Sequence, residues 1–244
     1  YVRCSCAHIF VYLYSNFSRC KVTTSILKNM ALYKTLTTQQ TTKVLIWKIE
    51  ESIADLRQGI SLSENSSTRL QSMKSELHQK GFLSIRHLLK EVGYSDFDLI
   101  YDEFGKPHLK DGKFISITHS YTFSGIIISE TCPVGIDIEK QREKILKIAP
   151  KFTPFEEYKT IANVDALVRK LTIVWGAKES LYKIYGKKKL LFLHHIFIED
   201  FAFEGKKTTG EIRFDGKISQ HAISFFEFED FTCVYAFSDS LISK

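Results

Sequence analysis

The 244-residue sequence has little of what marks fibrous, low-complexity or disordered chains. Its four prolines and twelve glycines exclude collagen-like and Pro/Gly-rich chains. Hydrophobic residues make up 44% and charged residues 25%, which are ordinary values for a globular protein. This composition excludes the low hydrophobicity and high net charge of disordered chains. The length allows one or two domains of roughly 150 residues each.

Residues 1–29 contain no acidic residue, although the whole chain has 28. Without the basic residues of this stretch, the net charge falls from +6 to +2. The basic character is therefore local and gives little support to nucleic-acid binding, and no RNP-like, zinc-finger or helix-turn-helix signature is present. Three of the five cysteines also lie here, and the other two, Cys132 and Cys233, suggest no disulfide framework.

The first methionine is Met30, and we expect residues 1–29 to be an upstream or disordered extension. The competing interpretation is a signal or membrane anchor. However, the apolar stretch 7–14 contains a histidine, and no A-x-A-like cleavage site follows it. It is also far shorter than the ~20 apolar residues needed to cross a bilayer. No later segment has a transmembrane pattern, so the sequence predicts a cytoplasmic protein without a membrane partner.

Strand-like and helix-like patterns are mixed along the rest of the chain, and its end is rich in strands. Polar or turn-rich loops are predicted over 61–68 and 101–109, and the apolar run 121–130 fits either a strand or a helix. Strands are predicted over 43–49, 114–118, 134–139, 190–203, 210–214, 222–228 and 231–237. Helices are predicted over 67–91 with a bend at Gly81, over 145–150, 155–162 and 165–183. Because there is no regular βαβ alternation, this pattern predicts an α+β fold.

Two acidic residues interrupt one of the predicted strands. Asp137 and Glu139 are two residues apart, so their side chains point to the same face of the strand. Like charges this close repel unless a cation lies between them, and carboxylate oxygens are ligands that suit Mg²⁺. The alternative is a solvated strand face, with Lys140 and Arg142 as neighbours.

The stretch 175–183 predicts a helix that brings a carboxylate close to lysines. Glu179 and Lys183 share one helix face with Trp175, while Lys178 lies on an adjacent face. A carboxylate beside lysines can hold a metal ion while the cations approach phosphate oxygens. The alternative is an ordinary Glu–Lys pair on the helix surface.

Two turn or strand-end motifs have residues that suit phosphate binding. Gly105 and Lys106 precede Pro107 in a predicted turn, where a glycine lets main chain and ammonium approach a phosphate. His119 and Ser120 follow the predicted strand 114–118 and could donate to a second phosphate. The alternatives are a plain β-turn and a strand-end histidine.

Together and in this order, these motifs resemble the 4′-phosphopantetheinyl transferase superfamily, specifically its large single-chain type that activates surfactin synthetase (Sfp-like). The matching residues are Gly105-Lys106-Pro107, Thr118-His119-Ser120, Gly135-Ile136-Asp137-Ile138-Glu139 and the helix 175–183. Phe152–Glu157 also resembles the family's F-S-P-x-E stretch, and the gap from Glu139 to Glu179 is of family-like length. Thr118 replaces the serine of the family pattern.

The resemblance implies transfer of the phosphopantetheine arm of coenzyme A to a serine of an acyl or peptidyl carrier protein, with release of adenosine 3′,5′-bisphosphate. Asp137, Glu139 and Glu179 would hold Mg²⁺, with Mn²⁺ as an alternative. Glu179, or a water on the metal, would take the serine proton, while Lys178 and Lys183 would stabilise phosphoryl charge. The residues implied in coenzyme A binding are Gly105, Lys106, Pro107, His119, Ser120, Arg86 and Lys80, with Arg86 preferred to Lys80.

The resemblance also implies two similar α+β halves related by a pseudo-twofold axis, with the active site in the cleft between them. The halves would be residues 30–135 and 136–244, and the second would carry the metal site. We expect a monomer. We also expect either Lys187–Lys189 or the segment 152–158 to lie near the carrier, although a solvated turn is the alternative for the lysine run.

Two rival functions remain open from the residues. A metal-dependent phosphodiesterase also uses clustered carboxylates, but it usually needs ligands for a second metal ion. A non-catalytic relative that binds coenzyme A or the carrier would be indicated by loss of Asp137, Glu139 or Glu179, and all three are present.

Overall fold

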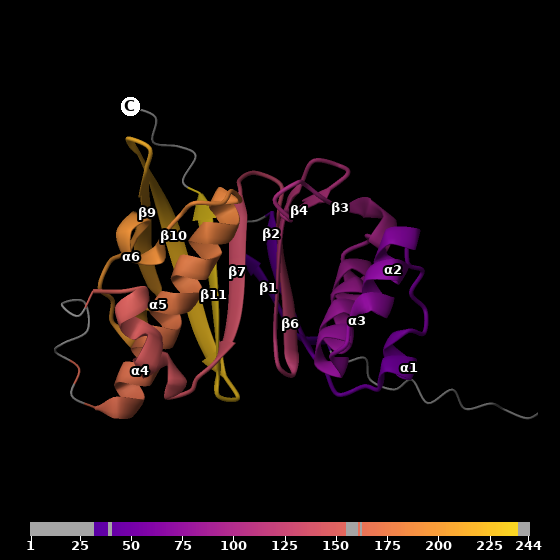
Figure 1. The fold of residues 1–244 in the computed structure, drawn as a ribbon, viewed down its shortest axis with the longest axis horizontal. Coiled ribbons are helices and arrows are strands. Elements are labelled where there is room, and N and C mark those ends of the chain that lie inside the picture. Colours follow the sequence, from indigo (N-terminus) through magenta and orange to yellow (C-terminus); the bar gives the residue numbers. More distant parts are fainter. Residues whose placement is uncertain (1–31, 39–40, 155–160, 162, 239–244) are drawn as a thin grey trace, which may run out of the picture. The chain divides into compact units, whose positions relative to one another are not determined.

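Two antiparallel sheets with helices packed against them form the described part of the chain, which is residues 32–38, 41–154, 161 and 163–238 of a computed structural model (Figure 1). This arrangement confirms the α+β class. The predicted extension 1–29 lies outside the described residues. Among the residues described, no helix is both long enough and apolar enough to span a membrane.

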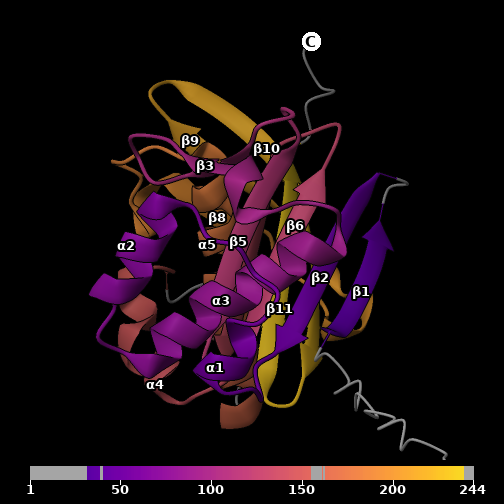
Figure 2. The same cartoon turned by 90° about the vertical axis from the view of Figure 1, so that its right-hand side faces the viewer.

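The first sheet has four strands in the order β1-β2-β6-β5. Its strands are β1 (Leu32–Thr38), β2 (Thr42–Lys48), β5 (Phe114–Ser120) and β6 (Phe123–Ser129). The helices are α1 (Ile53–Leu56), α2 (Glu64–Ser72) and α3 (Glu76–Glu91). Figure 2 shows α3 lying across one face of this sheet. We call β1 to β6, with these helices, the first half.

Side-chain alternation along β2 divides the first half's apolar residues between two cores. Leu45 and Trp47 pack with α3, whereas Val44 and Ile46 point to the opposite face, as the two-residue period of a strand requires. The apolar run 121–130 contains strand β6, and every residue of β6 is buried because both faces of the sheet are covered.

A short hairpin connects α3 to β5. It consists of a 3₁₀ turn, Asp96–Asp98, then β3 (Leu99–Tyr101) and β4 (Pro107–Leu109), which pair antiparallel. Gly105 adopts a φ of +84° in the loop between the strands, a conformation that glycine enters without steric cost. The turn expected over 101–109 is therefore present, flanked by two short strands.

The second half begins at β7 and contains a five-stranded sheet in the order β7-β11-β10-β9-β8. Its strands are β7 (Val134–Lys140), β8 (Ile196–Ile198), β9 (Lys207–Phe214), β10 (Lys217–Phe228) and β11 (Phe231–Ser238). Its helices are α4 (Lys144–Ile148), α5 (Val164–Tyr185) and α6 (Phe192–His195), with 3₁₀ turns at Ala149–Lys151 and Phe203–Gly205. The long helix α5 packs on β7 and β11.

A third core joins the two sheets, so the layers run helix, sheet, sheet, helix (Figure 1). It contains Val44 and Ile127 from the first half and Ile136, Ile138 and Tyr235 from the second. In each half, the strand before the long helix pairs with the last strand of the half: β2 with β6, and β7 with β11. The halves thus share a βαββ order, while their pseudo-twofold relation stays a prediction.

Three predicted segments differ from the structure. The helix expected over 67–91 is two helices, because Met73 is extended and Ser75 is the N-cap of α3. As α2 begins at Glu64, part of the loop expected over 61–68 is helical. The strand expected over 190–203 contains the short helix α6 before β8. Most of the predicted helix 155–162 lies outside the described residues.

Candidate functional site

The three candidate metal-binding carboxylates come from β7 and the helix that packs on it. A Cβ on Gly135 would lie 2.0 Å from the main-chain oxygen of Ser180, so only glycine lets β7 approach α5 this closely. A Cβ on Gly176 would lie 3.6 Å from Asp137 Oδ2. This close packing brings Asp137 of β7 near enough for its charge to act on Glu179.

Burial and the charge of Asp137 destabilise the charged forms of Glu139 and Glu179. Burial, followed by the negative charge of Asp137, raises the pKa of Glu139 to about 7. The same two causes raise the pKa of Glu179, opposed by the positive charge of Lys183. A cation placed among these groups would relieve the repulsion.

Asp137 is buried, and its two carboxylate oxygens differ in their partners. Oδ1 accepts hydrogen bonds from Lys183 Nζ at 2.8 Å and from Thr118 Oγ1 at 3.3 Å. Oδ2 is buried and has no hydrogen-bond partner within the described part of the chain. A buried carboxylate oxygen without a partner is costly, and this oxygen is free to bind a ligand.

These properties fit a divalent metal ion. Among the described residues, no three His, Cys, Asp or Glu side chains lie close enough to form a complete metal-binding group as they stand. The unpartnered Oδ2 of Asp137 and the raised pKa values of Glu139 and Glu179 nevertheless indicate unbalanced negative charge. Carboxylate oxygens of this kind are the ligands that Mg²⁺ takes in proteins, usually with waters and substrate phosphates.

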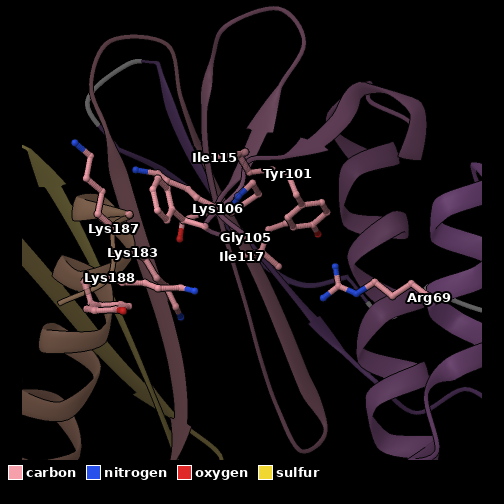
Figure 3. Close-up of a pocket in the computed structure, with 14 residues that line it drawn as sticks. Arg69, Tyr101, Gly105, Lys106, Ile115, Ile117, Lys183, Lys187 and Lys188 are labelled. Carbon is pink, nitrogen blue, oxygen red and sulfur yellow. The ribbon is translucent and has the colours of Figure 1, made fainter. Parts of the chain in front are cut away.

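A cavity of about 290 Å³ is lined from both halves. None of the three carboxylates lines it, but Lys183, which donates to Asp137, does. Figure 3 shows Arg69 on the first-half side and Lys187 and Lys188 on the second-half side, with Lys106 between them. Such a concentration of positive charge suits a ligand with several phosphate groups.

Lys106 connects the hairpin β3–β4 to the end of α5. Its Nζ donates to the main-chain oxygen of Ile184 at 2.6 Å, and burial lowers its pKa against the opposing effect of Asp102. A Cβ on Gly186, at the C-cap of α5, would lie 2.4 Å from Lys106 Cδ. Gly105, Lys106 and Pro107 all line the cavity, so the structure brings this predicted turn to the site.

His119 and Ser120 lie at the end of β5, close to the carboxylates. Ser120 Oγ donates to Glu139 Oε2 at 3.4 Å. The His119 ring lies 5.8 Å from the ring of His78, and loss of hydration, together with the charges of His78 and Lys183, lowers the pKa of His119. Both residues therefore lie near the acidic group, although the 290 Å³ cavity is lined by their neighbours Ser116 and Ile117.

Lys178 lies in the core of the second half, where it cannot stabilise phosphoryl charge in this conformation. Its side chain is fully buried, and its ammonium donates to the main-chain oxygens of Phe152 and Phe192. The predicted phosphate contact of Lys178 is therefore corrected to a structural role.

The side chain of Arg86 is also held by contacts outside the cavity. It is 3% exposed and donates from Nε to Asp96 Oδ1 at 2.8 Å, with further bonds to Phe82 O and Ser66 Oγ. Lys80 pairs with Glu76 at 3.0 Å on α3 and does not line the cavity. The preferred coenzyme A contact, Arg86, is thus a buried ion-pair residue, and Lys80 lies apart from the pocket.

Arg69, like Lys106, is a basic residue of the first half that lines the cavity, and the sequence analysis missed it. It is exposed, lies 5.2 Å from the ring centre of Tyr101, and has no acidic partner among the residues that are described. It also lines an adjoining cavity of about 470 Å³ with Ser63 and Ser66. No motif surrounds it in the sequence, and its place follows from the separation of α2 from α3.

Comparisons with known proteins agree with this site. The family model of the 4′-phosphopantetheinyl transferase superfamily matches residues 133–236, a segment that contains all three carboxylates. The chain is also similar to the 4′-phosphopantetheinyl transferase gsp of Aneurinibacillus migulanus, with 30% identity over 124 residues. That match covers 49% of this chain and 52% of the relative, so the chain spans about half the length of the curated protein it matches.

Proposed function

We propose an activity for this chain, which belongs to the 4′-phosphopantetheinyl transferase superfamily. It transfers the phosphopantetheine arm of coenzyme A to a serine hydroxyl of an acyl or peptidyl carrier protein, in the manner of the large Sfp-like type. The observation that carries the proposal is the buried, unpartnered Oδ2 of Asp137, whose charge acts on Glu139 and Glu179. Lys183 donates to Asp137 and lines the lysine-rich cavity.

The cavity supports binding of the nucleotide end of coenzyme A. Its phosphate groups need several cations, and the cavity offers Arg69 and Lys106 from the first half and Lys183, Lys187 and Lys188 from the second. Because these cations lie on both sides of the space, a multiply charged ligand would contact both halves at once. We assign Gly105 and Pro107 to shaping the Lys106 turn, and His119 and Ser120 to the edge of the phosphate site.

The reaction is a phosphoryl-group transfer. A new bond forms between the serine oxygen and the β-phosphorus of coenzyme A, and the bond from that phosphorus to the bridging oxygen breaks. The bridging oxygen leaves with adenosine 3′,5′-bisphosphate. Asp137, Glu139 and Glu179 would hold Mg²⁺ or Mn²⁺, which when bound supplies Lewis-acid stabilisation of pyrophosphate charge.

The side chains at the site have separate tasks in this reaction. Glu179 accepts the serine proton, since burial and the charge of Asp137 raise the pKa of its carboxyl group and so favour proton uptake. Lys183 carries a positive charge at the cavity and offsets negative charge that develops on the phosphoryl oxygens. Orientation of the weak serine nucleophile supplies much of the remaining rate.

The carrier protein is the proposed partner, approached by Lys187–Lys189 or the segment 152–158. Lys187 and Lys188 line the cavity, which favours nucleotide contacts for these two lysines. A monomeric state and a cytoplasmic location stay predictions.

The activity is tested by incubating the chain with coenzyme A, Mg²⁺ and several apo carrier proteins, and weighing each carrier by mass spectrometry. We expect a carrier to gain the mass of one phosphopantetheine. Glu179→Gln should slow the gain by at least about 100-fold, as expected for loss of a general base. The matched control is Glu91→Gln at the exposed end of α3, which should keep the wild-type rate.

Two results would contradict the proposal. Coenzyme A binding without any mass gain on the carriers would indicate a binding-only relative. An equal rate for Glu179→Gln and Glu91→Gln would remove Glu179 from the reaction.

A further inference from the structure

The inference concerns the contact between β5 and β7, the strands that meet where the two halves join. β5 ends the first sheet and β7 ends the second, so each is the outermost strand of its sheet. The main-chain groups on the free edge of an outermost strand need partners from outside the sheet. For β7, part of that edge is occupied by side chains of the first half.

Hydroxyl groups from alternate residues of β5 face the edge of β7. Ser116 Oγ accepts the main-chain N–H of Ile136, and Thr118 Oγ1 accepts that of Ile138, both at 3.2 Å. The two hydroxyl residues are 3% and 6% exposed. Residues i and i+2 of a strand share a face. The two hydrogen bonds therefore fix the register of β7 relative to β5.

Thr118 has a second bond that reaches the candidate metal site. Its single hydroxyl proton is donated to Asp137 Oδ1, at 3.3 Å, while its oxygen accepts the N–H of Ile138. Lys183 donates to the same Oδ1. Both donors therefore use one oxygen of Asp137 and leave the other, Oδ2, buried and without a partner.

We propose that Thr118 is a positioning residue that, with Lys183, turns Asp137 so that Oδ2 is the oxygen that binds the divalent cation. Because Thr118 belongs to the first half and Asp137 to the second, the metal site is complete only when the halves are in register. The proposal rests on the metal role assigned to Asp137 in the proposed function.

Thr118→Val is the direct test, because valine keeps the shape of threonine and removes both hydrogen bonds of the hydroxyl. Thr118→Ala removes the same hydroxyl with less bulk, and Thr118→Ser restores it. The matched control is Thr42→Val in β2, where a fully buried threonine hydroxyl donates to Ser129 Oγ within the first sheet. This control also loses a hydrogen bond of a buried threonine hydroxyl, but at a place away from the carboxylates.

The readout is the affinity for Mn²⁺ measured by calorimetry on the full chain, without turnover. We expect Thr118→Val and Thr118→Ala to bind Mn²⁺ about 10-fold more weakly than wild type, the usual effect of removing a residue that orients a metal ligand. Thr118→Ser should lie within about 3-fold of wild type, on the same reasoning. Thr42→Val should lose thermal stability but bind Mn²⁺ as wild type does.

Several results would overturn the proposal. Wild-type affinity in Thr118→Val would do so, and if that variant still loads a carrier, the proposed function would survive. If Thr42→Val lost as much Mn²⁺ affinity as Thr118→Val, the effect would come from a general loss of stability and Thr118 would have no positioning role. Absence of Mn²⁺ binding by wild type would overturn the metal role of Asp137 itself, and the carrier mass measurement would then decide the proposed function separately.

Discussion

Lys178 and Lys183 show how differently two lysines of one helical motif are used. Lys178 is fully buried and donates to main-chain oxygens. Lys183, five positions later on α5, is 27% exposed and donates to Asp137 at the cavity. Two side chains five residues apart on an α-helix point in directions about 140° apart around its axis. The two ammonium groups therefore lie on different sides of α5.

This difference predicts different effects on kcat for the same substitution. Lys178→Met removes the donor to the main-chain oxygens of Phe152 and Phe192, in one buried and one partly buried contact, which should cost about 1–3 kcal/mol for each group in the free energy of unfolding. Its folded fraction should keep near-normal kcat. Lys183→Met removes the donor to Ile136 O and the partner of the buried Asp137 carboxylate, so it should also lose stability. Unlike Lys178→Met, its folded fraction should lose about 100-fold in kcat, as expected for a group that stabilises transition-state charge.

Urea unfolding and steady-state carrier loading measure both quantities for both variants. A large loss of kcat in stable Lys178→Met would restore its predicted contact with phosphate.

Arg69 gives a second prediction for a single residue. Because it lines the cavity without an acidic partner among the described residues, Arg69→Ala should raise the KM for coenzyme A about 10-fold by loss of one charge-assisted contact of about 1.5 kcal/mol. The melting temperature should stay within about 2 °C, since surface substitutions usually change stability little. The control is Arg57→Ala, also exposed but away from the cavity, and equal KM values for the two variants would exclude Arg69 from the site.

The motifs located the three carboxylates and Lys106 but not Arg69. Asp137 and Glu139 share a strand face by period alone, and that period is visible in the sequence. Arg86 and Arg69 look alike in the sequence, since both lie among apolar residues at helical spacing. Only tertiary structure distinguishes them, because Asp96 and Ser66 surround Arg86 while Arg69 lies at the cavity.

Among the elements, the contact between β7 and α5 has the least spare room. A Cβ on Gly135 would meet main-chain atoms of Ser180, which cannot rotate away as a side chain can. Ser180 Oγ also donates to the main-chain oxygen of Val234 in β11, so α5 is tied to the sheet at this point. The glycine of the acidic motif is therefore a packing requirement.

Gly135→Ala should separate β7 from α5 and disturb the carboxylates together with the fold. We expect a loss of at least about 2–3 kcal/mol in the free energy of unfolding, the range for severe overpacking, and weaker Mn²⁺ binding. Gly205→Ala is the matched control, because its added Cβ would have no atom within 4 Å and its φ is not positive. Denaturant unfolding of both variants measures the difference, and equal stabilities would contradict the packing argument.

The elements that position the site were largely predictable, whereas the helices of the first half were not. β7 and α5 have strong local patterns, and their observed bounds differ from the predicted ones by a few residues. The apolar residues of 67–91 keep helical spacing across the break between α2 and α3, so the sequence predicted one helix. Its division depends on extended Met73 and on the serines that precede α2 and α3, and serine is also common in loops.

At the scale of the whole described chain, the first half depends on a buried polar group centred on Asp96. Its carboxylate accepts hydrogen bonds from Ser63, Ser66 and Arg86. Burial raises the pKa of Asp96, but the hydrogen bonds from Ser63 and the charge of Arg86 outweigh it and hold the pKa below its usual value. This group connects α2, with Arg69 at the cavity, to α3 and the 3₁₀ turn 96–98.

The lowered pKa of Asp96 predicts how stability depends on pH. The stabilisation is fully present above the unfolded-state pKa of about 3.9 and is lost as the pH falls through the lower folded-state value. Ser66→Ala removes one donor and should cost about 1 kcal/mol at pH 7, and this cost should shrink below about pH 4. Urea unfolding from pH 7 to pH 2 tests this, and a cost that is independent of pH would contradict it.

The central claim is that both halves together transfer a phosphopantetheine group, and the most direct test follows the nucleotide product. Coenzyme A, Mg²⁺ and the chain are incubated with and without an apo carrier protein, and adenosine 3′,5′-bisphosphate is measured by chromatography. The account predicts that this nucleotide forms only when the carrier is present, in equal amount to the carrier that gains mass. Release of the nucleotide at the same rate without any carrier would contradict the account and identify a phosphodiesterase.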